Sequence, residues 1–598
     1  MLMDEFGKSH KGFVSIRKVL LFLVPFVYAS ILCFSLSDEW FPADDKQEMV
    51  FVRDAKTIWS LLEVDVFGLF RPVKNLVFVL FGWMLPAIGV RGCRIAAIAV
   101  GAISFFPVLA LCRRIFRNER KAILATSIWL LSPTLVSSAA WLSAANIQIM
   151  VAFASLAIVF HDDAWNDTGR RDFRCLLAGS FLFMALISYE CAISIPPILF
   201  LFDLLLRPGR IKNRKVWLAY VFYAITVAAY LILRSSCHAS TQVNGSFVNI
   251  EQWQLVVSSP FFTGQHFLSW FWPFGRFTVF GSYKWGQASW TILVLCALLF
   301  VFVLAFAIAE WKRLSILSFC ILFALFAFAP VSNCLGFGNG PYGDYYLSFS
   351  SIGISAGFIE LCSLLLRRKG KLRPFAIAAV FIFASIRLLS LPEAVRWSRW
   401  WRSGERAYAV SIRNFPSFFY NKVVFAAFLF DSGRQDEALA LGDEVEAVIG
   451  ENAQQMSSIH QLRALYAIQT ERNAEKALEE IDKSLRTIES GRALANAHYY
   501  RGCVFEDLKG DDSAAEREYE LALAGKWDTD SVPCADRLAR LKAIRGEHDA
   551  AIELWEKAMK LDPGNTSVLW NLSIAYRSAG DNSLSNELRE RVRQLTEK

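Results

Sequence analysis

The chain has 598 residues, of which 55% are hydrophobic and only 20% are charged, and its formal net charge is +8. Soluble domains carry about 25% charged residues, so this composition excludes an ordinary soluble protein. The positive charge does not indicate nucleic-acid binding, because the lysine and arginine excess lies in short loops between apolar runs. Basic residues in such loops set the orientation of a membrane protein.

The apolar residues are concentrated in one part of the chain. Long apolar runs fill residues 18–391 and then stop, and after Pro392 the sequence is polar and rich in Glu, Ala, Leu and Arg. We therefore expect an all-α protein in three parts. These are a polytopic membrane domain at 1–391, a linker at 392–414 and a soluble helical domain at 415–598.

The membrane domain is predicted to contain eleven spans, since a helix of about 20 apolar residues crosses a bilayer. Basic residues precede the first apolar run and no small-residue cleavage site follows it, which is typical of an uncleaved signal anchor. The candidate spans are 18–36, 93–112, 121–138, 147–161, 175–189, 191–206, 216–233, 287–309, 314–332, 345–366 and 374–391.

Acidic residues gather directly after the first span, in the stretch 38–72. They include two adjacent pairs, Asp38-Glu39 and Asp44-Asp45. Acidic groups beside a membrane span are costly to keep near lipid, which makes this stretch a functional candidate. The alternative is a solvated loop that only joins two spans.

The apolar run Val73–Val90 is ambiguous, because it contains Lys74, Asn75 and Pro86. If it crossed the membrane, the basic loop 113–121 would lie opposite the basic N-terminus. The positive-inside rule therefore favours an interfacial or re-entrant helix within a first outer loop, 38–92. The same rule places the soluble domain on the outer face. It also places four shorter segments there, 141–146, 189–190, 234–286 and 333–344.

The soluble domain is predicted to be a tetratricopeptide α-solenoid of five helical pairs. Small residues and turn glycines recur along it, and the clearest interval, from Gly546 to Gly580, is 34 residues. This interval is typical of tetratricopeptide repeats, which stack into a concave surface for peptides or partner proteins. The first two units fit the spacing less well.

Familiar catalytic signatures are absent from the sequence. There is no GxxxxGK or HExxH motif and no GxSxG motif that follows a strand, and the seven histidines are dispersed. What remains on the predicted outer face is carboxylates and arginines. A carboxylate can act as general base toward a hydroxyl or hold a divalent cation, and the planar fork of arginine suits a phosphate.

Five segments resemble, in order, the motifs of a known enzyme family. They are Phe41–Asp45, Phe70–Val73, Leu131–Trp141, Ser188–Asp203 and Pro341–Ser348. Together with the repeat tail they are similar to the C-type (GT-C) polytopic glycosyltransferases, in particular the transmembrane-and-tetratricopeptide O-mannosyltransferases. The chain departs from that family at Tyr189, where a lysine is usual, and at Asn146, where an acid is expected. These departures weaken an assignment of mannose as the sugar.

The resemblance implies an inverting transfer of a sugar from a polyprenyl-phosphate donor to an acceptor, expected to be a protein, on the periplasmic or lumenal face. The repeat domain would recruit the acceptor or a partner. Asp44 or Asp45 would be the general base, with Asp38-Glu39 as the alternative acidic pair. Arg234 is the first candidate for the lipid phosphate, and the expected substrate-binding residues are Arg71, Glu190, Arg234, Asp344 and Tyr345.

Other interpretations stay open at this point. Arg234 could be an interfacial anchor, and Glu190 and Asp344 could be buried ion-pair partners. The whole chain could be a non-catalytic membrane-anchored scaffold, or a GT-C-like enzyme acting on lipid or polysaccharide. No cofactor is required by the sequence, although a divalent cation is compatible with the acidic pairs. Compact loops favour a bacterial inner membrane, with the N-terminus cytoplasmic and the repeats periplasmic.

Overall fold

The structure is a computed structural model. It describes residues 10–39, 45, 48–49, 62, 69–166, 168–237, 248–249, 251–279, 281–332, 342–367, 373–450, 454–488, 492–525, 527, 531–562 and 564–596. The described residues form helices, apart from loops and two short parallel strands, β1 (Val248–Asn249) and β2 (Tyr283–Lys284). The chain divides into two compact units, Met1–Asn421 and Lys422–Lys598. Each is described by itself.

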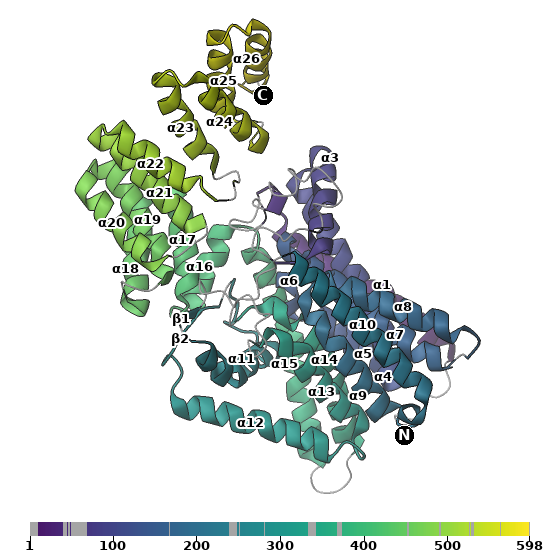
Figure 1. Ribbon diagram of the computed structural model, residues 1–598. Coiled ribbons are helices and arrows are strands. Elements are labelled where there is room, and N and C mark those ends of the chain that lie inside the picture. The colour runs from purple at the N-terminus through teal and green to yellow at the C-terminus, as the bar shows by residue number, and fades with distance from the viewer. Residues whose placement is uncertain are drawn as a thin grey trace. The chain divides into compact units, whose positions relative to one another are not determined.

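The first unit is a bundle of long apolar helices (Figure 1). Helices α7, α8 and α10 lie side by side, and short 3-10 turns connect several of the others. The helices are α1 (His10–Leu32), α3 (Pro72–Ile103), α4 (Phe105–Phe116), α5 (Glu119–Leu130), α6 (Val136–Ala140), α7 (Ala145–Asn166), α8 (Arg171–Leu186), α9 (Ile195–Leu206), α10 (Arg214–Ser236), α11 (Gln252–Phe271), α12 (Trp290–Ala309), α13 (Ser315–Phe328), α14 (Leu347–Arg367), α15 (Arg373–Trp400) and α16 (Gly404–Asn414).

Among the described residues, six helical segments are long and apolar enough to cross a membrane. A seventh is added if α5 and the segment Pro133–Ala140, which meet at a bend of 58°, count as one span. Pro133 lies at that bend, where a proline ring cannot continue the helix before it. The first unit is therefore membrane-associated, and the count of eleven spans stays a prediction. The six segments are Pro72–Phe116, Leu142–Asn166, Arg214–Ser236, Trp290–Ala309, Asp344–Arg367 and Arg373–Trp400.

Helix α3 folds back on itself at Gly89. This residue has φ 65° and ψ −177°, a conformation that side chains disfavour and glycine accepts. The Cys93 thiol lies 3.7 Å from the carbonyl oxygen of Phe81, whereas twelve residues of straight helix would separate them by about 18 Å. The predicted helix within Val73–Val90 is thus one arm of a hairpin. Its place relative to the membrane stays a prediction.

The predicted linker 392–414 is helical and belongs to the first unit. Helix α15 continues through it to Trp400, and α16 follows after a short turn. Trp397 and Trp401 are fully buried, and the Ser411 hydroxyl accepts a hydrogen bond from the Val279 N–H at 2.9 Å. The large apolar area of the two indole rings explains why this polar stretch packs against the bundle rather than forming a free connection.

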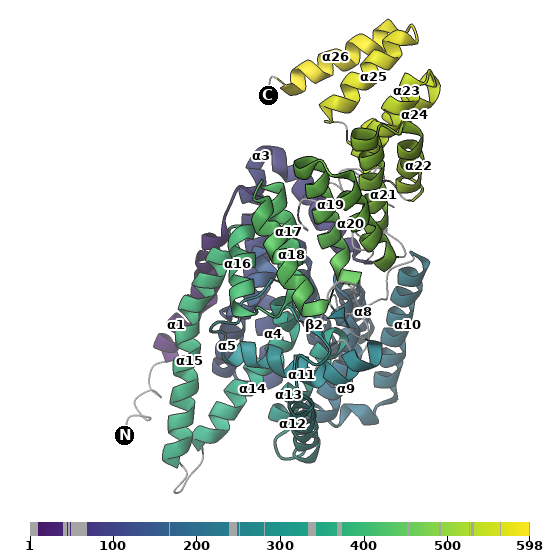
Figure 2. The ribbon, with the colours of Figure 1, turned by 90° about the vertical axis from the view of Figure 1, so that its left-hand side faces the viewer.

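The second unit is a row of paired helices (Figure 2). Consecutive helices pack as antiparallel pairs, which is the arrangement of tetratricopeptide repeats. The first pair includes α17 (Phe419–Asp431), which begins within the first unit. The remaining helices are α18 (Gln435–Ile449), α19 (Ser457–Tyr466), α20 (Ala474–Thr487), α21 (Arg492–Val504), α22 (Asp512–Ala522), α23 (Val532–Ile544), α24 (His548–Leu561), α25 (Thr566–Ser578) and α26 (Asn582–Thr596).

The turns inside the pairs differ along the repeat unit. Gly546 takes φ 84° at one turn, and the Glu547 N–H bonds back to the Lys542 carbonyl at 2.9 Å, as in a Schellman cap. In the second pair Arg472 takes the left-handed position, with φ 53°, after a π-helical turn over Ala467–Glu471. A π turn accommodates an additional residue. It accounts for part of the deviation of this unit from the 34-residue interval, and it changes the turn, since the Asn473 N–H bonds back to the Ala467 carbonyl at 3.0 Å.

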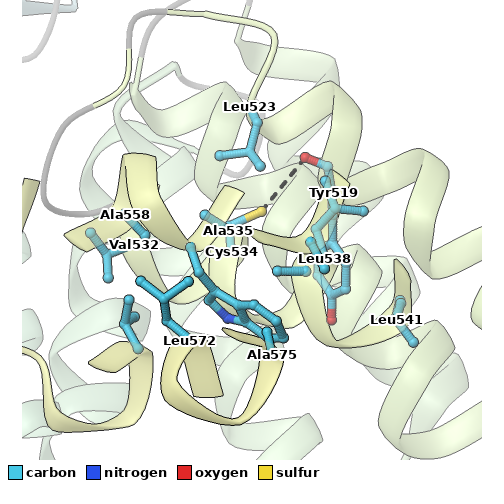
Figure 3. Packing of buried hydrophobic residues seen from close by; sticks show 14 of the residues in the cluster. Tyr519, Leu523, Val532, Cys534, Ala535, Leu538, Leu541, Ala558, Leu572 and Ala575 are labelled. Atoms are coloured by element: carbon cyan, nitrogen blue, oxygen red, sulfur yellow. Dashed lines mark hydrogen bonds between the residues drawn. The ribbon is translucent and has the colours of Figure 1, made fainter. Parts of the chain in front are cut away.

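The core of the later repeats is formed by small and aromatic residues from several helices (Figure 3). Tyr519 is fully buried beside Cys534, whose thiol lies 3.6 Å from the Tyr519 carbonyl oxygen. The buried alanines Ala535 and Ala558 and the indole of Trp555 belong to the same cluster. Small residues at crossings allow close helix packing, which is what a stacked repeat requires.

Candidate functional site

Asp45 is a buried carboxylate with one oxygen bound and one oxygen open. Its Oδ1 accepts hydrogen bonds from the Ser143 N–H at 3.0 Å and the Ser143 hydroxyl at 2.8 Å. Its Oδ2 is buried and accepts no hydrogen bond from the described part of the chain. Burial raises the pKa of Asp45, and the Ser143 hydrogen bonds and the Arg94 charge oppose that rise. Asp44 lies outside the described residues.

Ser143 is presented to Asp45 by a sharp turn between two apolar segments. Trp141 is extended, with φ −97° and ψ 114°, and a 3-10 turn, η5 (Leu142–Ala144), then leads into α7. The sequence singled out the turn 141–146 but not Ser143 itself. The only available signal was a hydroxyl in a short polar connection between two spans, at a position where backbone N–H groups at the start of a helix lack partners.

The alternative pair, Asp38-Glu39, lies at the surface. The Asp38 side chain is 70% exposed and forms an ion pair with Arg91 at 2.5 Å. The Glu39 carbonyl oxygen accepts a hydrogen bond from Arg94 at 2.9 Å, and Arg94 also donates to the Ser35 carbonyl at 2.7 Å. This pair thus anchors the end of α1 through its backbone, while its carboxylates face outward.

Arg71 and Glu190 form a buried bidentate ion pair. The Arg71 Nε and Nη2 each lie 2.8 Å from a Glu190 oxygen, and the two side chains are 6% and 1% exposed. Arg71 precedes α3, where Pro72 occupies the first turn, and Glu190 opens a 3-10 turn, η7 (Glu190–Ser194). The Arg71 guanidinium lies over the Tyr189 ring at 4.4 Å. Tyr189 therefore supports this arginine rather than competing for Glu190.

Arg234 is buried near that pair. It lies at the end of α10 and is 4% exposed, with its Nη1 at 3.4 Å from the Tyr230 hydroxyl. The Tyr230 ring is 6.2 Å from the Phe70 ring, directly beside Arg71 in the chain. The structure therefore brings the two predicted arginines to one region, although Glu190 pairs with Arg71 and not with the phosphate candidate Arg234.

Asp344 belongs to a separate polar group built on α11. It accepts hydrogen bonds from the Tyr342 hydroxyl at 3.3 Å and the Ser269 hydroxyl at 3.4 Å. The neighbouring His266 donates from Nδ1 to the Phe262 carbonyl and accepts the Gly343 N–H at Nε2. Burial lowers the pKa of His266 to about 4, so this imidazole is neutral and structural at physiological pH.

Tyr345 connects these groups. Its ring contacts Trp141 edge-on at 5.5 Å, and Trp141 stacks on Trp401 at 5.8 Å. The turn after Trp141 carries Ser143, the partner of Asp45, so the Asp344 segment and the Asp45 segment meet through one aromatic contact. We call this side of the first unit, where α7 begins, the Asp45 end.

A second buried polar group lies at the far end of α7, which we call the Asp162 end. The Asp162 carboxylate is 2.7 Å from Arg210, and the Asp203 carboxylate is 2.9 Å from the His161 Nε2. Every acid in it is neutralised by charged or hydroxyl partners. In the sequence Asp203 stands out only as part of a family-like segment, and the network is not apparent there. Its remaining members are Arg114, Arg207 and Tyr220.

Metal binding finds no support in the part of the chain that the structure describes. No three His, Cys, Asp or Glu side chains there are grouped closely enough to hold a metal ion. The described residues of the first unit instead offer a hydrogen-bond acceptor on Asp45 in a low-dielectric setting and a buried arginine, Arg234, in the region of Arg71. These groups can accept a proton and bind an anion.

Comparisons with known proteins give weak likenesses. No family model and no curated protein matches the chain. It is similar to the apo oligosaccharyltransferase of Archaeoglobus fulgidus, with a TM-score of 0.42 and 14% identity over 84% of this chain and 72% of that one. The archaeal enzyme AglB in complex with an inhibitory peptide and a dolichol-phosphate gives 0.40 and 13% over the same shares. YrrB, a tetratricopeptide protein with an unusual peptide-binding site, gives 0.24 and 16% over 32% of this chain and 93% of that one.

Proposed function

We propose that this protein is a membrane glycosyltransferase with a lipid-linked sugar donor, and that Asp45 is its general base. The observation that carries the proposal is the state of this carboxylate. One oxygen is fixed by Ser143, and the other is buried with no hydrogen-bond donor from the described residues. A general base needs an acceptor position in reach of a reacting hydroxyl, and a raised pKa brings a carboxylate closer to the pH at which it works.

The proposed reaction is a single inverting displacement. Asp45 Oδ2 takes the proton from the acceptor hydroxyl as the acceptor oxygen forms a bond to the anomeric carbon of the sugar. The bond between that carbon and the phosphate oxygen breaks, and the polyprenyl phosphate leaves with the electron pair. A planar guanidinium stabilises the charge on the leaving phosphate.

We assign the leaving phosphate to Arg234. The forked edge of Arg71 faces Glu190, with both oxygens at 2.8 Å, so Arg71 acts as a positioning residue for the Asp45 end. Asp344 and Tyr345 lie beside the same turn through Trp141, where they would contact sugar or acceptor hydroxyls. Contacts of this kind, rather than the base, would determine which sugar and which acceptor the protein uses.

The repeats complete the proposal. We infer that the Asp45 end faces the periplasm of a bacterial inner membrane, as the positive-inside rule predicts from the basic loops. An inner-membrane enzyme of this kind would receive its donor from the membrane itself. The tetratricopeptide unit would recruit an acceptor protein or a partner through its concave surface.

The test replaces the buried acid and compares it with the exposed one. Asp45→Asn keeps the shape of the side chain and removes its basicity, so we expect transfer from lipid-linked sugar in native membranes to fall about 10²- to 10⁴-fold. Asp38→Asn is the matched control, because Asp38 is 70% exposed and paired with Arg91. It should retain transfer within about twofold. Normal amounts of inserted protein establish that each variant folds.

Other outcomes select the alternatives. If Asp38→Asn loses transfer and Asp45→Asn keeps it, the exposed pair is the base. If deletion of the protein leaves every envelope glycan unchanged, on protein, lipid and polysaccharide, the chain is a membrane-anchored scaffold. A change confined to lipid or polysaccharide identifies a different acceptor for the same enzyme.

A further inference from the structure

A pocket opens between the first turns of α8 and α10, at the Asp162 end. Its volume is about 450 Å³. It is distinct from the site proposed above, because α7 separates the two. The 22 residues of this helix span about 33 Å at 1.5 Å per residue, which is close to the thickness of a bilayer core. The lining residues are Trp165, Arg171, Asp172, Cys175, Leu176, Lys215, Leu218, Ala219 and Phe222.

The pocket is polar at its mouth and apolar in its depth. Arg171 and Lys215 lie in the first turns of α8 and α10, and Leu176 and Leu218 follow further along the same helices. Deeper still, the two helices touch, since a Cβ on Gly179 would lie 2.2 Å from the Phe222 ring. This contact closes the floor and makes the pocket a wedge that narrows into the membrane.

The walls of this wedge face lipid. Leu218 is 68% exposed and Leu176 is 54% exposed. Apolar side chains so exposed on a membrane-associated bundle are covered by acyl chains rather than by water. The pocket therefore opens directly to the bilayer, which supplies its occupant without any other partner.

The two cations at the mouth of the pocket can still bind an anion. Within the described residues neither Arg171 nor Lys215 forms an ion pair, and the buried Arg171 Nε makes no hydrogen bond. The Arg171 guanidinium stacks on Trp165 at 5.0 Å, which holds it at the mouth with its edge available. Asp172 subtracts one charge, so the lining side chains sum to a net +1. Basic residues at the membrane surface attract anionic headgroups.

We propose that this pocket binds an anionic phospholipid of the surrounding leaflet. Its phosphate would lie between Arg171 and Lys215, and its acyl chains would follow Leu176 and Leu218 into the wedge. Trp165 sits at headgroup depth, where indole rings are favoured. The proposal does not depend on the proposed glycosyl transfer.

The experiment measures binding of phosphatidylglycerol and phosphatidylcholine to the full chain in detergent by native mass spectrometry. We expect one phosphatidylglycerol to bind, and Arg171→Gln with Lys215→Gln to weaken it roughly ten- to thirtyfold. Phosphatidylcholine should bind weakly to both forms. Asp172→Asn should tighten phosphatidylglycerol binding, a gain that damaged protein cannot show.

The matched control is Lys312→Gln with Arg313→Gln, which removes two basic residues from the short turn between α12 and α13. It should leave phosphatidylglycerol binding unchanged. Equal weakening in the control and the pocket variant would overturn the proposal, because the effect would then be general surface charge. Displacement of the lipid by glycerol phosphate at equal concentration would also overturn it, since the ligand would then be a soluble phosphate.

Discussion

The two ends of α7 hold buried acids in opposite conditions. At the Asp162 end the carboxylates are fully neutralised, with Arg210 at 2.7 Å from Asp162 and His161 at 2.9 Å from Asp203. At the Asp45 end, among the described residues, Ser143 holds one oxygen of Asp45 and the other accepts no hydrogen bond, while Arg71 is paired with Glu190.

This difference separates buried acids that stabilise the fold from a buried acid that can take part in a reaction. In a closed ionic network each acid faces a cation, and removing any member leaves a buried charge without compensation. An acid whose second oxygen is open can accept a proton from outside. The predictions below test whether the two ends differ in this way.

The largest effect is expected for the Arg71–Glu190 pair. Glu190→Gln leaves a buried guanidinium without its counter-charge, and we expect a loss of about 3–5 kcal/mol of unfolding free energy. Thermal unfolding of the purified protein in detergent measures it. Arg71→Leu with Glu190→Leu should recover much of that stability without recovering transfer. The control, Glu119→Gln, breaks a pair with Arg113 that is 26–36% exposed, and its cost should stay below about 1 kcal/mol.

Substitutions at the Asp162 end should lower the unfolding free energy without changing transfer. Asp162→Asn weakens the charge between Arg207 and Arg210, and we expect a loss of about 2–4 kcal/mol. Transfer per folded molecule should not change, because the Asp45 end lies about one membrane thickness away. Asp163→Asn, at a side chain that is 24% exposed, should cost less. A loss of turnover in folded Asp162→Asn protein would contradict the separation of the two ends.

The pH dependence of transfer tests the hydrogen bond to the base. Ser143 favours the ionised form of Asp45, so Ser143→Ala should raise the pKa of that carboxyl further. Because the ionised form is the active one, the acidic limb of the pH–rate profile should move to higher pH. Ser132→Ala, which removes a hydroxyl bonded to Thr134, should leave the limb in place. A limb that stays fixed in both variants means that another group is the base.

The smallest effect is expected in the repeat unit, where ion pairs are near the surface. Lys542 donates to Glu516 at 2.7 Å and lowers the pKa of that carboxyl. The stabilisation is thus present above the ordinary glutamate pKa and is lost as the pH falls through the lowered value. Glu516→Gln should cost about 0.5–1 kcal/mol near neutral pH. Hydrogen exchange of α22–α24 in the full chain measures it, with the exposed Glu520→Gln as control.

Local patterns in the sequence account for much of the fold. The apolar runs predicted the long helices, and the glycine turn at Gly546 predicted the repeat pairs. The predicted 34-residue interval did not hold near Arg472, which occupies the position of a turn glycine. A π turn and a left-handed arginine cannot be read from composition. The helical packing of 392–414 could not be read from its polar sequence, because it depends on Trp397 and Trp401 burying their rings.

The site was less accessible to such reasoning. The sequence placed Asp45, Arg71, Glu190 and Arg234 among the candidates, yet it could not pair Arg71 with Glu190, which lie 119 positions apart. Such pairing depends on how helices pack, and that information is spread over many apolar residues. Ser143 was missed for the same reason, since a serine in a turn has no chemical signature until its partner is known.

The open oxygen of Asp45 has an energetic consequence for the folded protein. A buried acceptor without a donor costs about 1–3 kcal/mol relative to one that is satisfied. A hydroxyl that enters and donates to this oxygen would remove that cost, so acceptor binding should raise the melting temperature even when no donor lipid is present. Under the proposed function, the hydroxyl that satisfies this oxygen is that of the acceptor.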